Sequence, residues 1–241
     1  MQTVILCGGK GTRLREYTEI IPKPMVEIGG KPILWHLMRL YASYGFKEFI
    51  LCLGYKGEII RDYFKDNKEW NITFVDTGQE TNTGGRIKKI EEYLKEDLFF
   101  ATYADGLANV NLQNLLNHHN EKQKIATLTT VNPLSQFGII DIDDDHTILK
   151  FKEKPLMNQW INGGFFVFNK EIFKYLDEDS VLEKVPFEKL AEDRQIAAYK
   201  FKGFWKCMDT CLVNSSRIRV RISAALRPLV CKNWKRFSDA V

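Results

Sequence analysis

The stretch "LCGGKGTRLREYTEIIPKPM", residues 6–25, decides how this chain is interpreted. It continues an apolar run that predicts a strand, and its glycines let backbone N–H groups approach a ligand closely. Cations follow at Lys10, Arg13 and Lys23. A glycine-rich loop with several cations close to it in the sequence favours a polyphosphate ligand. Both familiar phosphate loops are excluded, because no Gly-Lys-Ser/Thr follows four spacers and the GxGxxG pattern begun at Gly9 has Leu14 as its third glycine position.

Strand-like and helix-like segments alternate along the rest of the chain. Strands are expected at 2–7, 49–53, 71–76, 98–105, 125–131, 138–143, 148–155, 163–169 and 196–201. Helices are expected from Pro32 to a stop at Gly45, at 57–66, 84–96 and 111–122, and in two further stretches before 196. This order predicts an α/β fold: a mostly parallel, twisted, Rossmann-like sheet with helices on both faces and a smaller β-rich part. Such sheets bind ligands beyond the carboxyl ends of their strands.

Length and composition favour an ordinary soluble globular protein. The chain has 241 residues, 44% of them apolar, and no apolar run reaches the ~18 residues of a membrane span. Its N-terminus lacks the basic start and apolar core of a signal peptide, so we expect a cytoplasmic protein without a membrane partner. Five cysteines without regular spacing predict neither a disulfide framework nor a zinc site.

The net charge of +4 comes from the end of the chain. Residues 211–241 hold seven Lys or Arg and one acid, which leaves 28 basic and 30 acidic residues in 1–210. The body is therefore not a nucleic-acid-binding surface. We expect one domain over 1–210 and a divergent basic tail over 211–241, irregular and mobile because its apolar residues form a weak helical stripe that Pro228 ends.

Two acids are candidate metal ligands, and each has a plainer interpretation. Asp105 in "ATYADG" closes an apolar strand, where it could bind Mg²⁺ beside phosphates or simply form an Asp-Gly turn. Asp209 in "GFWKCMDT" could join it or cap a helix. The metal interpretation requires that both carboxylates meet in one cleft.

Other motifs are equally open when each is taken alone. "FKEKP", with Glu153 and Lys154, is typical of a solvated charged edge strand, and "INGGFFVFN", with Asn162 and Gly163, of a bulged strand start that could also seat a sugar. "TGGR", ending at Arg86, offers free N–H groups at a helix start. The pair His118–His119 predicts a solvated surface, and Phe204–Trp205 the core or a pocket wall.

Taken together and in order, these motifs resemble the sugar-1-phosphate nucleotidyltransferases. The segments that carry the resemblance are GGxGTRL, "PKPM", the Asp-Gly after an apolar strand, "EKP", "NGG" and a late Asp, spread over positions 2–210. "KPMVEIGGKPILWH", "VDTG", "TGGR" and "GFWKCMDT" are most similar to the glucose-1-phosphate cytidylyltransferase group. The resemblance stops after Thr210.

The resemblance implies a role for each matching residue. The nucleotide would be bound by Leu6, Gly8, Gly9, Gly11, Thr12, Arg13, Lys23, Arg86 and Asp105, with Arg13 on the triphosphate and Lys23 between the α-phosphate and the sugar phosphate. The sugar phosphate would be bound by Tyr103, Glu153, Lys154, Asn162 and Gly163. Arg13, Lys23, Asp105 and Asp209 would form the catalytic set, with Asp105 and Asp209 holding Mg²⁺.

The reaction so implied joins CTP and α-D-glucose 1-phosphate into CDP-glucose and pyrophosphate, in an enzyme expected to be a homo-oligomer. Two alternatives stay open. The enzyme could use another nucleotide, such as UTP or dTTP, or another sugar 1-phosphate. The chain could also be a non-catalytic nucleotide-sugar-binding subunit, although such proteins usually lose the cations and acids that are present here.

Overall fold

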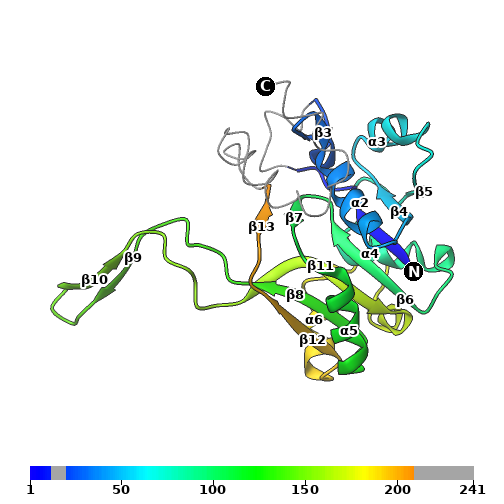
Figure 1. Ribbon diagram of the computed structural model, residues 1–241. Coiled ribbons are helices and arrows are strands. Elements are labelled where there is room, and N and C mark those ends of the chain that lie inside the picture. The colour runs from blue at the N-terminus through cyan, green and yellow to red at the C-terminus, as the bar shows by residue number, and fades with distance from the viewer. Residues whose placement is uncertain (12–19, 209–241) are drawn as a thin grey trace.

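In the computed structural model, which describes residues 1–11 and 20–208, a seven-stranded sheet forms the centre of the molecule (Figure 1). Its strands run in the order β12-β8-β11-β6-β1-β4-β5. Their bounds are β1 Gln2–Leu6, β4 Glu48–Leu53, β5 Asn71–Asp76, β6 Leu98–Tyr103, β8 Ala126–Val131, β11 Ile161–Asn169 and β12 Ile196–Phe201. Neighbours pair in parallel except at β11, which is antiparallel to both β6 and β8. The expected mostly parallel α/β sheet is confirmed.

Helices cover both faces of this sheet. They are α2 Ile33–Ser43, α3 Gly57–Phe64, α4 Thr83–Lys88, α5 Leu112–Lys122 and α6 Val185–Glu192, with 3₁₀ turns at Lys23–Met25, Glu91–Tyr93 and Lys170–Tyr175. Side chains alternate between the faces, so Ile5 packs in the cluster under α2 and α5, whereas Val4 packs in the cluster with α4 and α6. Burial on both faces explains the near-continuous apolar strands of the sequence.

Short strands complete the fold. β2 Glu27–Ile28 pairs with β3 Lys31–Pro32, and β7 Gly106–Ala108 pairs with β13 Trp205–Cys207. β9 Ile139–Ile142 and β10 Ile148–Lys152 form a separate two-stranded hairpin that projects from the body (Figure 1). No helix among the described residues is long and apolar enough to cross a membrane.

Two local expectations were wrong. The helix expected over 84–96 ends at Lys88 and continues as a 3₁₀ turn, where the N–H of Ile90 donates to the carbonyl of Ile87 at 3.1 Å. His119 is not solvated: it is buried, and its Nδ1 lies 2.9 Å from the Thr127 hydroxyl of β8. The polar sequence of α5 concealed this contact, because one His faces the sheet while most neighbouring side chains face water.

Candidate active site

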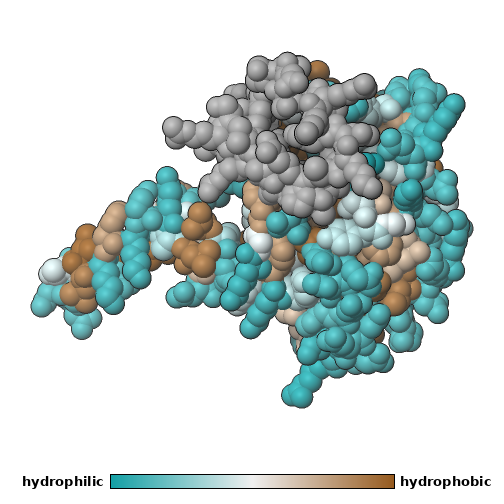
Figure 2. Space-filling model, viewed as in Figure 1, coloured by the Kyte–Doolittle hydropathy of each residue, from teal (hydrophilic) through white to brown (hydrophobic). Residues whose placement is uncertain are grey.

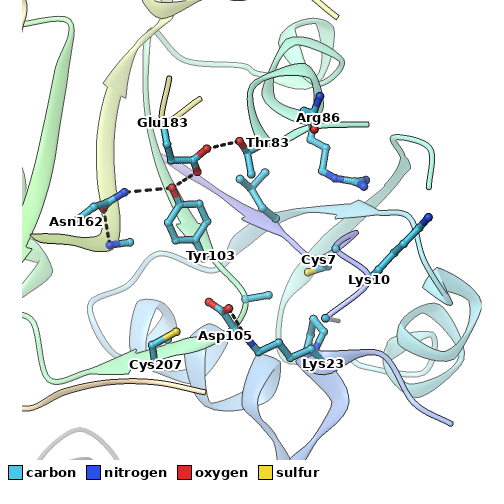
Figure 3. Close-up of a pocket in the computed structure, with 18 of the residues that line it drawn as sticks. Cys7, Lys10, Lys23, Thr83, Arg86, Tyr103, Asp105, Asn162, Glu183 and Cys207 are labelled. Carbon is cyan, nitrogen blue, oxygen red and sulfur yellow. Dashed lines mark hydrogen bonds and ion pairs between the residues drawn. The ribbon is translucent and has the colours of Figure 1, made fainter. Parts of the chain in front are cut away.

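A cavity of about 760 Å³ opens at the carboxyl ends of β1 and β6 (Figure 3). Parallel strands that end together leave their loops around a common space, and this is where α/β sheets bind ligands. Its lining comes from the first loop (Leu6 to Gly11 without Gly8), from the Lys23–Pro24 turn, and from residues 79–83 with Arg86. Further segments around Asp105, Asn162, Glu183 and Trp205 complete the lining. The structure thus brings together most of the described residues that the sequence marked.

Lys23 and Asp105 form an ion pair on the cavity floor. Nζ of Lys23 lies 2.6 Å from Oδ2 of Asp105, although 82 positions separate the two residues (Figure 3). Lys23 begins a 3₁₀ turn between two prolines and only 8% of the residue is exposed. Pro22 and Pro24 fix the backbone, so the ammonium is held in place by the fold. A buried cation and a carboxylate in one cavity are suited to phosphates and to a hard metal ion.

Arg86 ties together the ends of three neighbouring parallel strands. Its Nη atoms donate to the carbonyls of Leu53 at 3.0 Å, Gly78 at 2.8 Å, Gly8 at 3.0 Å and Gln79 at 3.3 Å, and to the Thr77 hydroxyl at 2.6 Å. These acceptors end or follow β1, β4 and β5, whose order in the sheet is β1-β4-β5. Burial lowers the pKa of the guanidinium, but its partners keep it saturated with hydrogen bonds.

The glycine pair at the start of the first loop is explained by this arrangement. A Cβ on Gly8 would overlap with the Arg86 guanidinium, so only glycine fits there. Gly8 faces Arg86 and is not among the residues lining the cavity, whereas Gly9 and Gly11 are, and no described residue lies within 4 Å of a Cβ built on Gly9. The two glycines therefore differ: Gly8 makes room for the Arg86 side chain, and Gly9 lines the cavity.

A chain of hydrogen bonds crosses the opposite wall of the cavity (Figure 3). The Tyr103 hydroxyl donates to Glu183 and accepts from Nδ2 of Asn162 at 3.2 Å. Thr83 donates to the other Glu183 oxygen at 2.7 Å. Burial, and next the Glu183 charge, raises the pKa of Tyr103, so its hydroxyl stays protonated. These hydrogen bonds join the N-terminus of α4 to β6, to β11 and to the segment before α6. They hold amide, hydroxyl and carboxylate groups side by side.

Trp205 closes the cavity beside this chain. Its indole Nε1 donates to the carbonyl of Gly163 at 2.8 Å. Oδ1 of Asn162 accepts from the N–H of Gly164 at 2.9 Å, and Gly164 has a φ of +78° and lies against the Tyr103 ring. The NGG segment is thus a bulged strand start, as its sequence allowed, and it also lines the cavity. Trp205 is a pocket wall, as expected.

Glu153 and Lys154 do not lie in this cavity. They follow β10 at the base of the projecting hairpin, where their side chains are 62% and 61% exposed and their charged atoms lie 3.6 Å apart. They are solvated, as their plainer interpretation allowed, but the strand expected over 148–155 ends at Lys152, so the two residues lie in a bend and not on an edge strand. Thr12, Arg13, Asp209 and the tail over 211–241 lie outside the described residues, so their expected roles stay predictions.

Sequence reasoning missed Glu183 and Thr83. Glu183 stands in a charged run, "LEKV", without a motif, and nothing local distinguishes it from a solvated acid. It is marked only by its hydrogen bond with Tyr103, which lies 80 positions away in the sequence. Thr83 begins the quoted TGGR motif, in which the glycines and Arg86 drew the attention.

Comparisons with known proteins agree with this geometry. Residues 2–213 match the family described as Nucleotidyl transferase. The chain belongs to this family. A probable glucose-1-phosphate cytidylyltransferase of Bacillus subtilis strain 168 is 44% identical, over 87% of this chain and 92% of the relative. The glucose-1-phosphate cytidylyltransferase of Salmonella typhi is 42% identical, over 87% and 91%.

Solved structures support the fold. HddC from Yersinia pseudotuberculosis superposes with a TM-score of 0.68 at 26% identity, covering 87% of this chain and 94% of that one. A putative glucose-1-phosphate thymidylyltransferase from Bacillus anthracis reaches a TM-score of 0.72 at 15% identity, over 99% of both chains. The expected membership of the nucleotidyltransferases and their Rossmann-like fold are therefore confirmed.

Proposed function

We propose that this nucleotidyltransferase transfers a cytidylyl group from CTP to α-D-glucose 1-phosphate, giving CDP-glucose and pyrophosphate. The observation that carries the proposal is the Lys23–Asp105 pair in a cavity between an open glycine loop and a wall of sugar-compatible groups. The two curated relatives at 42–44% identity, both named for this activity, support the choice of base and sugar.

The chemistry needs positioned charge more than a proton acceptor. The second pKa of a phosphate monoester is about 6, so the attacking sugar-phosphate oxygen is already ionised at neutral pH. This oxygen forms a bond to the α-phosphorus of CTP, and the bond from that phosphorus to the bridging oxygen breaks, which releases pyrophosphate. Lys23 is buried and held by its prolines, so its ammonium can bridge the two anionic groups and stabilise the charge that develops between them.

The residues present fit a divalent metal ion, which we propose to be Mg²⁺. Asp105 offers carboxylate oxygen on the cavity floor, and Mg²⁺ is usually held by one or two carboxylates together with substrate phosphates. Among the described residues no three acids, His or Cys gather, so Asp105 would be joined by substrate oxygens and by Asp209, which lies outside the described ranges. When bound, Mg²⁺ would neutralise charge on the leaving pyrophosphate.

We propose that different walls of the cavity bind the two substrates. We assign the glycine loop, with Gly9 and Gly11 and the framework held by Arg86, to the nucleotide, and Arg13 to the triphosphate. We assign the Asn162–Tyr103–Glu183 hydrogen-bonded chain and Gly163 to the sugar, because hydroxyl groups need both donors and acceptors at close range.

The test is the release of pyrophosphate across four nucleoside triphosphates and several sugar 1-phosphates, with Mg²⁺ present. We expect turnover with CTP and α-D-glucose 1-phosphate to exceed every other pair. A clear preference for UTP or dTTP would overturn the cytidylyl assignment while leaving the nucleotidyl transfer intact. We further propose that the enzyme is a homo-oligomer, through the surface described next.

A further inference from the structure

The projecting hairpin of β9 and β10, here called the arm, has an uncovered apolar face. Directly opposed residues of an antiparallel pair share a face, and Ile140 lies opposite Phe151 and Ile142 opposite Ile148. These four side chains, the arm face, are 41%, 64%, 53% and 56% exposed in that order. Figure 2 shows brown side chains along the arm, well away from the body.

The other side of the arm is different. It carries Ile139 opposite Lys152 and Asp141 opposite Lys150, and the latter two form an ion pair at 3.9 Å. One side of the arm is therefore wholly apolar and the other is mixed, while the exposed Leu149 stands at a bulge outside the pairing. A sheet with one apolar side is typical of one that packs on a partner through that side. An isolated two-stranded hairpin is at best marginally stable in water, and a contiguous exposed apolar patch marks an interaction site.

We propose that the arm face packs against the arm face of a second copy of this chain, with the two arms antiparallel. The charges of the arm favour this occupant. Its turn is acidic, with Asp143, Asp144 and Asp145, whereas the end of β10 and the two residues after it, Lys152, Glu153 and Lys154, carry a net positive charge. Antiparallel arms related by a two-fold axis place the acidic turn of each beside the basic end of the other. A parallel arrangement would place like charges together.

The first experiment compares two matched variants of the full chain by sedimentation-velocity ultracentrifugation. Ile140→Asp puts a charge on the arm face, and Ile139→Asp makes the same change at the adjacent residue, 44% exposed, on the other side. We expect the wild type and Ile139→Asp to be oligomeric, and Ile140→Asp to dissociate with a Kd at least about 30-fold higher, the scale of an interface hot spot. Unfolding temperatures should not separate the two variants, because neither side chain packs in the two core clusters of the body.

The second experiment tests the direction of pairing by exchanging charges. A variant with Asp144→Lys and Asp145→Lys, and another with Lys152→Glu and Lys154→Glu, should each self-associate more weakly than the wild type. Mixed in equal amounts they should form a hetero-oligomer, because each altered turn then meets an altered end of opposite charge. Asp143 is left unchanged since it accepts from the N–H groups of Asp145 and Thr147 and shapes the turn.

Three results would overturn the proposal. A wild type that is monomeric at about 100 µM would mean that something other than a second copy covers the arm face. Equal association of Ile140→Asp and Ile139→Asp would place the interface elsewhere. Charge variants that do not recover association on mixing would exclude the antiparallel pairing.

Discussion

Replacing Arg86 by lysine should loosen the nucleotide side of the cavity and lower the stability of the whole domain. The guanidinium Nη atoms serve five acceptors in three loops. A lysine ammonium has three donors on one atom and cannot span the same fork. At least two of the five acceptors are then left without their donor in a buried place, at about 1–3 kcal/mol each. We therefore expect Arg86→Lys to lower the free energy of unfolding by roughly 2–6 kcal/mol.

Two assays measure this effect. A loss of about 3 kcal/mol should lower the Tm by roughly 6–12 °C for a chain of this size, read by calorimetry or circular dichroism. The loops after β1, β4 and β5 would then no longer be held together, so CTP binding measured by calorimetry should weaken even below the Tm. We expect the Kd to rise about ten-fold or more, which corresponds to the free energy of one hydrogen bond to a charged group. Arg61→Lys is the matched control, since Arg61 is exposed and only lies over the Phe74 ring at 5.0 Å. A Tm for Arg86→Lys within 1 °C of that control would refute the role given to Arg86.

Three further changes are expected to have separable effects. Lys23→Ala should lower kcat by a factor of roughly 10², the scale for removing one electrostatic stabiliser, in steady-state assays; a change in KM alone would reduce Lys23 to a binding role. Glu183→Gln leaves one side-chain oxygen for the two hydroxyl donors, Tyr103 and Thr83. The KM for the sugar phosphate should therefore rise about five-fold, while the KM for CTP stays as in the control variant Glu188→Gln. Equal rises in both KM values would reject the assignment of this wall to the sugar. Burial lowers the pKa of His119, so the folded state favours the neutral imidazole. The free energy of unfolding should therefore be highest above the pKa that this histidine has in the unfolded chain. It should fall as the pH drops below that value, by at most about 1.4 kcal/mol per pH unit. Urea unfolding between pH 7.5 and 5.5 should show this slope, and an equally steep slope in His119→Gln would exclude His119 as its source.

The order of elements was predictable because it rests on local patterns. Continuous apolar runs marked the buried parallel strands, and Gly45, with a φ of +90°, ended the helix begun after Pro32. The cavity followed from the same reasoning, since Gly9 and Asp105 both lie shortly beyond the ends of β1 and β6 in one sheet. Lys23 was identifiable because two prolines and a cation form a local signal.

Contacts between distant segments were not predictable in this way. Arg86 was expected to lie near the nucleotide, and it does line the cavity, but its hydrogen bonds to three strand ends depend on the order β1-β4-β5, which no local pattern contains. For the same reason Glu183 was missed and His119 was expected to be solvated, because their partners Tyr103 and Thr127 are brought near only by the folded sheet. The direction of the arm, which carries Glu153 and Lys154 out of the cavity, also depends on tertiary contacts.

The most direct test is to identify the product. The purified chain is incubated with CTP, α-D-glucose 1-phosphate and Mg²⁺, and the mixture is analysed by phosphorus NMR and mass spectrometry. We expect CDP-glucose and pyrophosphate in equal amounts, with formation slowed about 10²-fold in Lys23→Ala. A chain that binds CDP-glucose yet forms neither product would contradict catalysis and identify a nucleotide-sugar-binding subunit instead.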